Sequence, residues 1–183
     1  LKKLNNNGFQ AYIVGGYVRD SILNIDSNDI DITTNATPNE VKEIFDIKNS
    51  NGEKYLSVVV NQDEYSFEVT TFRKDISYSD HRHPVTEITN SLDEDLKRRD
   101  FTINALLMDA NGKVYDYYQG LDDLKNKQIK SIGDPNIRFD EDSLRILRAC
   151  HFTSKLGFDI EKSTFDAMLK NVKSIKSLSS ERI

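Results

Sequence analysis

Two acidic residues near the start of the chain have the spacing of a metal site. Asp29 and Asp31 lie in an expected strand, and side chains two apart on a strand share a face, so both carboxylates can hold Mg²⁺. Glu68 lies in an apolar run, where a charge is costly unless it faces out or is paired. Three carboxylates from two strands could hold two Mg²⁺ ions, which activate an attacking hydroxyl and stabilise a leaving pyrophosphate. The alternative is that all three are solvated residues at strand edges.

A pair of glycines precedes the acidic residues. Gly15 and Gly16 follow an expected strand and open an expected helix, with Arg19 in its first turn. Backbone N–H groups at a helix start, together with an arginine, can hold a triphosphate. The alternative is that Arg19 pairs with Asp20 or Asp29 and fixes the turn.

A second cluster consists of Arg98, Arg99 and Asp100. It could be a solvated helix end. It could also contact a nucleotide, with Asp100 accepting a hydrogen bond from a ribose hydroxyl and Arg99 reaching a phosphate or a base.

A third cluster contains Asp142, Arg145 and Arg148 on an expected helix. Asp142 and Arg145 are three residues apart and can pair with each other. They could also select bases, because cytosine and adenine both show an exocyclic amine beside a ring-nitrogen acceptor. Uracil and guanine place a carbonyl where the amine should be, and Asp142 would repel it. Arg148 could reach phosphates from the same helix.

The expected elements place these clusters on a mixed α/β scaffold. Strands are expected at residues 9–14 and 28–33, hairpins at 55–72 and 105–117, and a mobile loop at 75–89. Thr37, Pro38 and Glu40 give a strong helix-start signal. The remaining expected helices are residues 1–8, 17–23, 92–99, 140–155 (ended by Gly157) and 162–172.

Composition narrows the class of protein. The chain has 183 residues, of which 37% are hydrophobic and 30% charged, with a formal net charge of −5. This is typical of a soluble globular protein with a core, and the acidic balance argues against a large nucleic-acid footprint. The single cysteine, Cys150, excludes an internal disulfide and favours a reducing, cytoplasmic compartment. No stretch approaches the roughly 18 apolar residues of a membrane span, so we expect no membrane partner.

Taken in order, these motifs resemble one family, the class II tRNA nucleotidyltransferases and bacterial poly(A) polymerases. The resemblance extends over nearly the whole chain. The segments that carry it are Gly15-Gly16-x-Val18-Arg19-Asp20, Asp29-Ile30-Asp31-Ile32-Thr33-Thr34, Thr37-Pro38, Glu68-Val69-Thr70-Thr71-Phe72-Arg73, Arg98-Arg99-Asp100-Phe101-Thr102-x-Asn104-Ala105 and Glu141-Asp142-x-x-Arg145-x-x-Arg148.

The resemblance implies an α+β fold in two parts. Residues 1–120 would form a catalytic head with a five-stranded mixed sheet and flanking helices, and residues 121–183 a truncated helical neck. The body and tail of the family would be absent. The chain begins without methionine and stops just after a Ser-Ser helix-start signal, which favours a fragment of a longer protein.

The resemblance also implies template-independent addition of CCA, from CTP and ATP, to the tRNA 3′ end. Mg²⁺ would be held by Asp29 and Asp31, and the nucleotide phosphates by Gly16 and Arg19. The residues implied to contact CTP or ATP are Arg99, Asp142, Arg145 and Arg148. Residues 75–89 correspond to the flexible loop that the family uses to switch from C to A addition, which favours a full CCA-adding enzyme.

Two departures from the family pattern affect these expectations. His151 stands where the family usually has an arginine, so a phosphate contact there would be weaker and pH-dependent. Residues 52–57 have lost the family's Gly-x-x-His-Gly-Thr. The alternatives are a poly(A) polymerase or a CC- or A-adding enzyme of the same family, and, from another class, a non-catalytic nucleotide- or RNA-binding module. The sequence does not indicate an oligomeric state.

Overall fold

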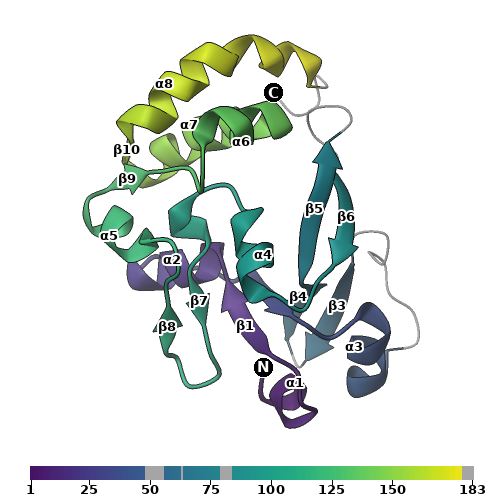
Figure 1. Ribbon diagram of the computed structural model, residues 1–183. Helices are drawn as coiled ribbons and strands as arrows, with labels where there is room; N and C mark the ends of the chain where they lie inside the picture. Colours follow the sequence, from purple (N-terminus) through teal and green to yellow (C-terminus); the bar gives the residue numbers. More distant parts are fainter. Residues whose placement is uncertain (48–55, 63, 79–83, 179–183) are drawn as a thin grey trace.

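The computed structural model describes residues 1–47, 56–62, 64–78 and 84–178 (Figure 1). The helices are α1 (Lys2–Asn6), α2 (Gly16–Ile22), α3 (Pro38–Phe45), α4 (Leu92–Lys97), α5 (Gly120–Lys125), α6 (Pro135–Glu141), α7 (Leu144–Leu156) and α8 (Lys162–Asn171), with 3₁₀ helices η2 (Thr102–Asn104) and η3 (Val172–Ser177). The strands are β1 (Ala11–Val14), β2 (Ile30–Thr34), β3 (Ser57–Gln62), β4 (Tyr65–Thr71), β5 (Arg73–Tyr78), β6 (Pro84–Ile88), β7 (Leu107–Met108), β8 (Val114–Tyr115), β9 (Gln128–Ile129) and β10 (Asp159–Ile160).

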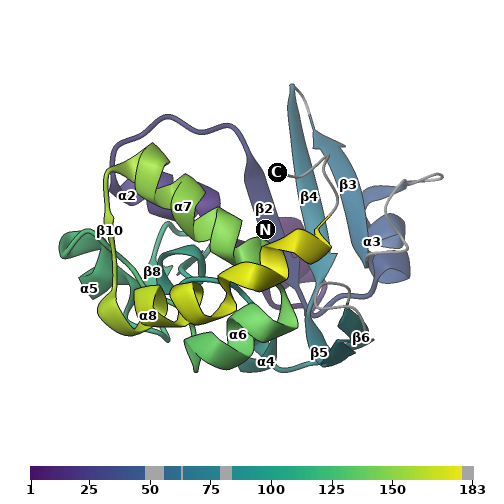
Figure 2. The same cartoon turned by 90° about the horizontal axis from the view of Figure 1, so that it is seen from above.

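The main sheet is mixed and has six strands in the order β3-β4-β2-β1-β7-β8. The expectation of an α+β fold is confirmed. The sheet has six strands, one more than the five that the resemblance implied, and the short strand β8 forms one edge. Viewed from above, β3 and β4 lie on the side of the molecule away from β8 and α5 (Figure 2). Among the described strand pairs of this sheet, only β2 and β4 are parallel, and their register pairs Asp31 with Glu68. The sheet thus brings two predicted site residues together.

Local signals determine where the helices nearest the sheet begin. Gly15 is the N-cap of α2 and has a φ of 78°, a backbone conformation that glycine adopts without strain. Thr37 and Glu40 form the predicted capping box at the start of α3. Both helix starts were predicted from sequence and are confirmed.

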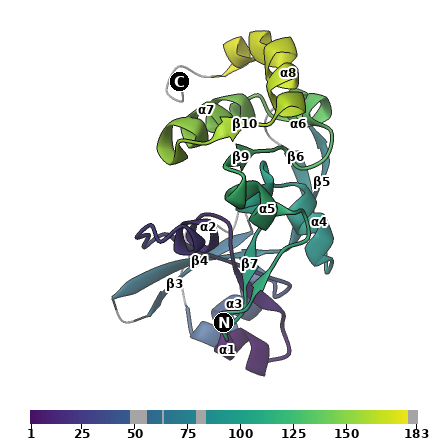
Figure 3. The same cartoon turned by 90° about the vertical axis from the view of Figure 1, so that its left-hand side faces the viewer.

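The prediction of a mobile loop at residues 75–89 is wrong for the part of this range that the structure describes. Instead, β5 and β6 pair as an antiparallel hairpin that rises from the sheet toward the C-terminal helices (Figures 1 and 3). Its base is fixed by contacts distant in sequence, because the backbone N–H of Arg73 donates to Asp95 Oδ1 at 3.3 Å. Lys74 and Glu87 pair across the strands at 3.5 Å. Residues 79–83 lie outside the described part of the chain, as do residues 52–55 of the altered family motif and residues 179–183, the expected start of another helix.

The prediction of a single helix over residues 140–155 is also wrong, because this range is divided between the end of α6 and most of α7. Asp134 caps α6 separately, α6 ends at Glu141, and Asp142 adopts an extended conformation with φ −145° and ψ 101°. The Asp142 carboxylate accepts a hydrogen bond from the backbone N–H of Leu144 at 3.0 Å, which favours a new helix start there. As a result, Asp142 and Arg145 do not share a helix as predicted.

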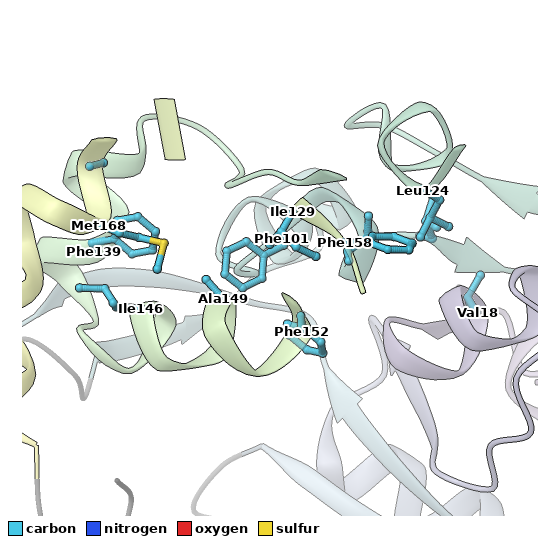
Figure 4. Packing of buried hydrophobic residues seen from close by; sticks show 13 residues of the cluster. Val18, Phe101, Leu124, Ile129, Phe139, Ile146, Ala149, Phe152, Phe158 and Met168 are labelled. Atoms are coloured by element: carbon cyan, nitrogen blue, oxygen red, sulfur yellow. The ribbon is translucent and has the colours of Figure 1, made fainter. Parts of the chain in front are cut away.

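The C-terminal helices share a core with the sheet part. One buried cluster contains Val18 and Phe101 together with Phe152, Phe158 and Met168 of the helical part (Figure 4). The helices α6, α7 and α8 gather at one end of the molecule, and α1 and α3 lie at the other (Figures 1 and 3). A division into head and neck at residue 120 stays a prediction. Within the described ranges no helix has the length and apolar character needed to cross a membrane.

Candidate functional site

A cleft of about 510 Å³ lies where the start of α2, the start of β2, the β5–β6 hairpin and α7 meet. All predicted site residues except Glu68 and His151 line it. They are Gly15, Gly16, Arg19, Asp29, Asp31, Arg99, Asp100, Asp142, Arg145 and Arg148. Residues from opposite ends of the chain therefore form one site.

The predicted carboxylates occupy one side of the cleft. Asp29 is exposed and directly precedes β2, whereas Asp31 is half-buried within that strand. Glu68 is exposed on β4 and shares a smaller neighbouring pocket with Asp31. Burial, followed by repulsion from Asp29 and Glu68, raises the pKa of Asp31 to about 6, although Arg99 opposes the shift. Asp29 and Glu68 thus both act electrostatically on Asp31.

This donor set suits Mg²⁺ with ligands from elsewhere. Among the described residues, no three His, Cys, Asp or Glu side chains are grouped closely enough to hold a metal ion by themselves. Mg²⁺ characteristically uses one or two carboxylates together with water and substrate phosphates. Asp29 and Asp31 fit that pattern, because a bound dication would offset both the burial and the repulsion from Asp29 that raise the pKa of Asp31. Magnesium binding stays a prediction.

Arg19 is held firmly at the cleft. It is 2% exposed, and its guanidinium donates to Asp20 Oδ1 at 2.7 Å and to Asn104 Oδ1 at 2.6 Å. The pairing with Asp20 that the sequence offered as an alternative is therefore present. Arg19 still lines the cleft beside Gly16, so fixing the turn and facing a ligand are compatible.

Asp100 is a buried acceptor already surrounded by donors. Its carboxylate accepts from Arg148 Nε at 2.6 Å, from the Phe101 backbone N–H at 2.8 Å and from Asn104 Nδ2 at 3.1 Å. Burial alone would raise its pKa, but Arg148 and these hydrogen bonds hold the pKa below its usual range. Asp100 is thus ionised at neutral pH and able to accept hydrogen bonds.

Sequence reasoning missed Asp95, which holds the neighbouring arginines. Asp95 is 0% exposed on α4, and it accepts from Arg98 Nη2 at 2.8 Å, from Arg99 Nη2 at 3.3 Å and from Thr33 Oγ1 at 3.0 Å. Burial would raise its pKa, but the two arginines outweigh burial and lower it. The available signal was an aspartate three and four residues before two arginines on a helix.

Arg145 is 5% exposed and its hydrogen bonds connect three elements. It donates to Glu141 Oε2 at 3.1 Å, to the Arg98 carbonyl at 3.0 Å and to the Tyr78 hydroxyl at 3.3 Å. Sequence reasoning missed Tyr78 because the segment that contains it was expected to be a loop. Burial and a hydrogen bond to Asp75 raise the pKa of Tyr78 to about 12, so the phenol stays protonated. Arg145 and Asp142 both face the cleft, from adjoining segments rather than from one helix.

His151 is the predicted nucleotide contact that least fits the geometry. It is exposed, lies outside the cleft lining, and packs edge-on against Phe152 with ring centroids 5.4 Å apart. Lys155, one turn further along α7, lines the cleft instead and pairs with Asp20 at 3.4 Å. A cation four residues after His151 was the signal that could have indicated it.

Comparison with known proteins gives consistent matches over this chain. A family profile described as the Poly A polymerase head domain matches residues 11–130. The CCA-adding enzyme of Lactobacillus helveticus (strain DPC 4571) is 49% identical over 185 residues, which cover 100% of this chain and 46% of that protein. This chain therefore spans about half the length of such relatives.

Solved structures also match. The crystal structure of the Bacillus stearothermophilus CCA-adding enzyme in complex with CTP gives a TM-score of 0.89 and 38% identity, over 99% of this chain and 44% of that chain. A tRNA nucleotidyltransferase complexed with a primer tRNA and an incoming ATP analog gives a TM-score of 0.77 and 29% identity, over 99% of this chain and 52% of that one.

Proposed function

This chain belongs to the family that carries the Poly A polymerase head domain, and we propose that it is the catalytic head of a CCA-adding tRNA nucleotidyltransferase. One observation carries the proposal. A single cleft is lined both by Asp29 and Asp31 and by several arginines. Three of these arginines, Arg19, Arg99 and Arg148, donate hydrogen bonds to buried aspartates. That combination suits a nucleoside triphosphate, whose phosphates need positive charge and whose reaction centre needs carboxylates.

The proposed reaction transfers a nucleotide to the 3′ end of tRNA. The terminal 3′-hydroxyl oxygen attacks the α-phosphorus of CTP or ATP, and the bond from that phosphorus to the β-phosphate oxygen breaks. Pyrophosphate leaves, and the proton of the hydroxyl passes to solvent. Two Mg²⁺ ions, when held by Asp29 and Asp31 with help from Glu68, would activate the hydroxyl and stabilise the leaving group.

The remaining residues have roles in binding. Gly16, the first residue of α2, can offer its backbone N–H to a phosphate, and Arg19 and Arg148 supply positive charge. Gly15 instead shapes the turn, because its own N–H donates to the Leu106 carbonyl at 3.0 Å. Asp100 is ionised and can accept a hydrogen bond from a ribose hydroxyl. We assign base selection to Asp142 and Arg145, because an acceptor beside a donor matches the edges of cytosine and adenine.

The test is nucleotide incorporation by the full-length protein on tRNA that ends before CCA. With CTP and ATP, we expect addition limited to C, C and A. Replacing both Asp29 and Asp31 by alanine should lower the rate on the order of a thousandfold. Asp26→Ala serves as the matched control, because Asp26 is an exposed carboxylate outside the cleft. An unchanged rate in the double variant would refute the carboxylate assignment.

A second candidate function is that of a poly(A) polymerase, because the matching family model is described as the Poly A polymerase head domain. Supplying each nucleotide separately, to tRNA and to unrelated RNA, separates the two functions. Long A tails on any RNA would overturn the proposal of CCA addition.

A further inference from the structure

Two cations of the cleft, Arg19 and Arg148, come from parts of the chain far apart in sequence but share the same two supports. We propose that Asn104 and Phe152 are positioning residues that hold Arg19 and Arg148 together as one phosphate-binding pair. The inference rests on the proposed function, because it assigns both arginines to the nucleotide phosphates.

The first support is a polar bridge through Asn104, which is 6% exposed. Arg19 Nη1 donates to the amide oxygen of Asn104 at 2.6 Å, and the amide nitrogen donates to Asp100 Oδ1 at 3.1 Å. The other oxygen of Asp100 accepts from Arg148 Nε at 2.6 Å. The bridge needs an acceptor toward one arginine and a donor toward Asp100, and a side-chain amide supplies both.

The second support is the ring of Phe152, which is 7% exposed on α7. The guanidinium carbon of Arg19 lies 5.0 Å from the ring centroid, and that of Arg148 lies 5.2 Å from it. Both distances are within the range of cation–π attraction. Phe101 contacts the same ring edge-on at 6.0 Å and thereby fixes it in the core.

The carboxylates at the two ends of this arrangement offset the repulsion between the two arginines. Two guanidinium groups that share one ring repel each other, and Asp20 and Asp100 compensate that repulsion from opposite ends of the bridge. Arg148 uses Nε for Asp100, and its side chain stays 48% exposed. A phosphate can therefore reach Arg148 without first breaking the bridge, and it meets Arg19 already in place.

The test compares two phenylalanines of the same core cluster (Figure 4). Phe152→Leu removes the ring that both arginines share. Phe158→Leu is the matched control, since Phe158 is 5% exposed and lies outside the cleft lining. In the full-length protein we expect similar losses of melting temperature. Only Phe152→Leu should raise the KM for CTP, by about tenfold, with kcat changed less than twofold. Phe152→Tyr keeps a ring and should restore the KM.

A second variant tests the polar bridge without removing core volume. Asn104→Asp keeps an acceptor for Arg19 but sets a carboxylate against Asp100, so we expect the KM for CTP to rise about tenfold as well. If the wild-type protein incorporates CTP and both Phe152→Leu and Asn104→Asp keep its KM, the positioning role is overturned while the proposed function stands. If the wild-type protein neither binds nor incorporates CTP, the proposed function and this inference fail together.

Discussion

Replacing Asp31 by asparagine should stabilise the protein when no divalent cation is present. The pKa of Asp31 rises from its ordinary 3.8 to about 6, because burial and the neighbouring carboxylates disfavour the charge. A folded state that binds a proton more tightly than the unfolded state loses stability as pH rises from about 4 to about 6. Above pH 6 the whole unfavourable contribution is present, and asparagine, which carries no charge, removes it.

The size of the effect follows from the pKa. A rise from 3.8 to about 6 is about two pKa units, and at about 1.4 kcal/mol per unit it gives an upper limit of about 3 kcal/mol. Asp31 is only half-buried, so solvent screening reduces the effect to about 1.5 kcal/mol. For a chain of this length, that corresponds to a rise in melting temperature of about 3–6 °C.

Scanning calorimetry of the 183-residue chain in EDTA measures this directly. At pH 7.5 the Asp31→Asn variant should melt above the wild type, and at pH 5 the difference should fall to about half. Asp26→Asn, at an exposed carboxylate outside the cleft, should leave the melting temperature unchanged. A variant that melts at or below the wild type at pH 7.5, or a gain independent of pH, would refute the reasoning.

Three further predictions concern the scaffold and the metal. Gly120→Ala should lower stability by about 2–3 kcal/mol in a melting experiment, because a Cβ atom there would lie 2.4 Å from the Thr102 carbonyl oxygen; an unchanged melting temperature would contradict this close approach. Asp95→Asn should destabilise by about 3 kcal/mol in urea titrations, since it leaves two half-buried arginines without their buried counter-charge; a loss below 1 kcal/mol would contradict that pairing. Adding Mg²⁺ should raise the melting temperature of the wild-type chain but not that of the double alanine variant of Asp29 and Asp31, and equal shifts would place the ion elsewhere.

Much of the scaffold was predictable where the signal is local. The Gly15-Gly16 turn, the capping box at Thr37 and the Asn111-Gly112 hairpin each depend on the conformational preferences of a few adjacent residues. The β5–β6 hairpin was missed because its strands are polar and partly exposed on both faces. Its base is fixed by Asp95, which comes later in the sequence.

The site likewise has features that local sequence predicts and features that depend on contacts between distant residues. The spacing of Asp29 and Asp31 indicated a carboxylate pair without any knowledge of the fold. The break at Asp142 was not predictable from spacing, because aspartate is tolerated both within a helix and at its start. The contacts of Tyr78 with Arg145 and of Phe152 with Arg19 join residues distant in sequence, so only the folded chain reveals them.

The position of β1 has a consequence for how the protein is made. This first strand lies inside the sheet, where Ile13 pairs with Ile32 on one side and with Met108 on the other. At about 5–20 residues per second, ribosomes need roughly 4–15 s to synthesise the chain from Ile32 to Met108, the two partners of Ile13. Until then one edge of β1 has no strand to pair with. Because β1 has only 4 residues, this open edge offers few backbone groups for pairing with other chains. Because α7 is translated later still, the cleft is completed only near the end of synthesis of this segment.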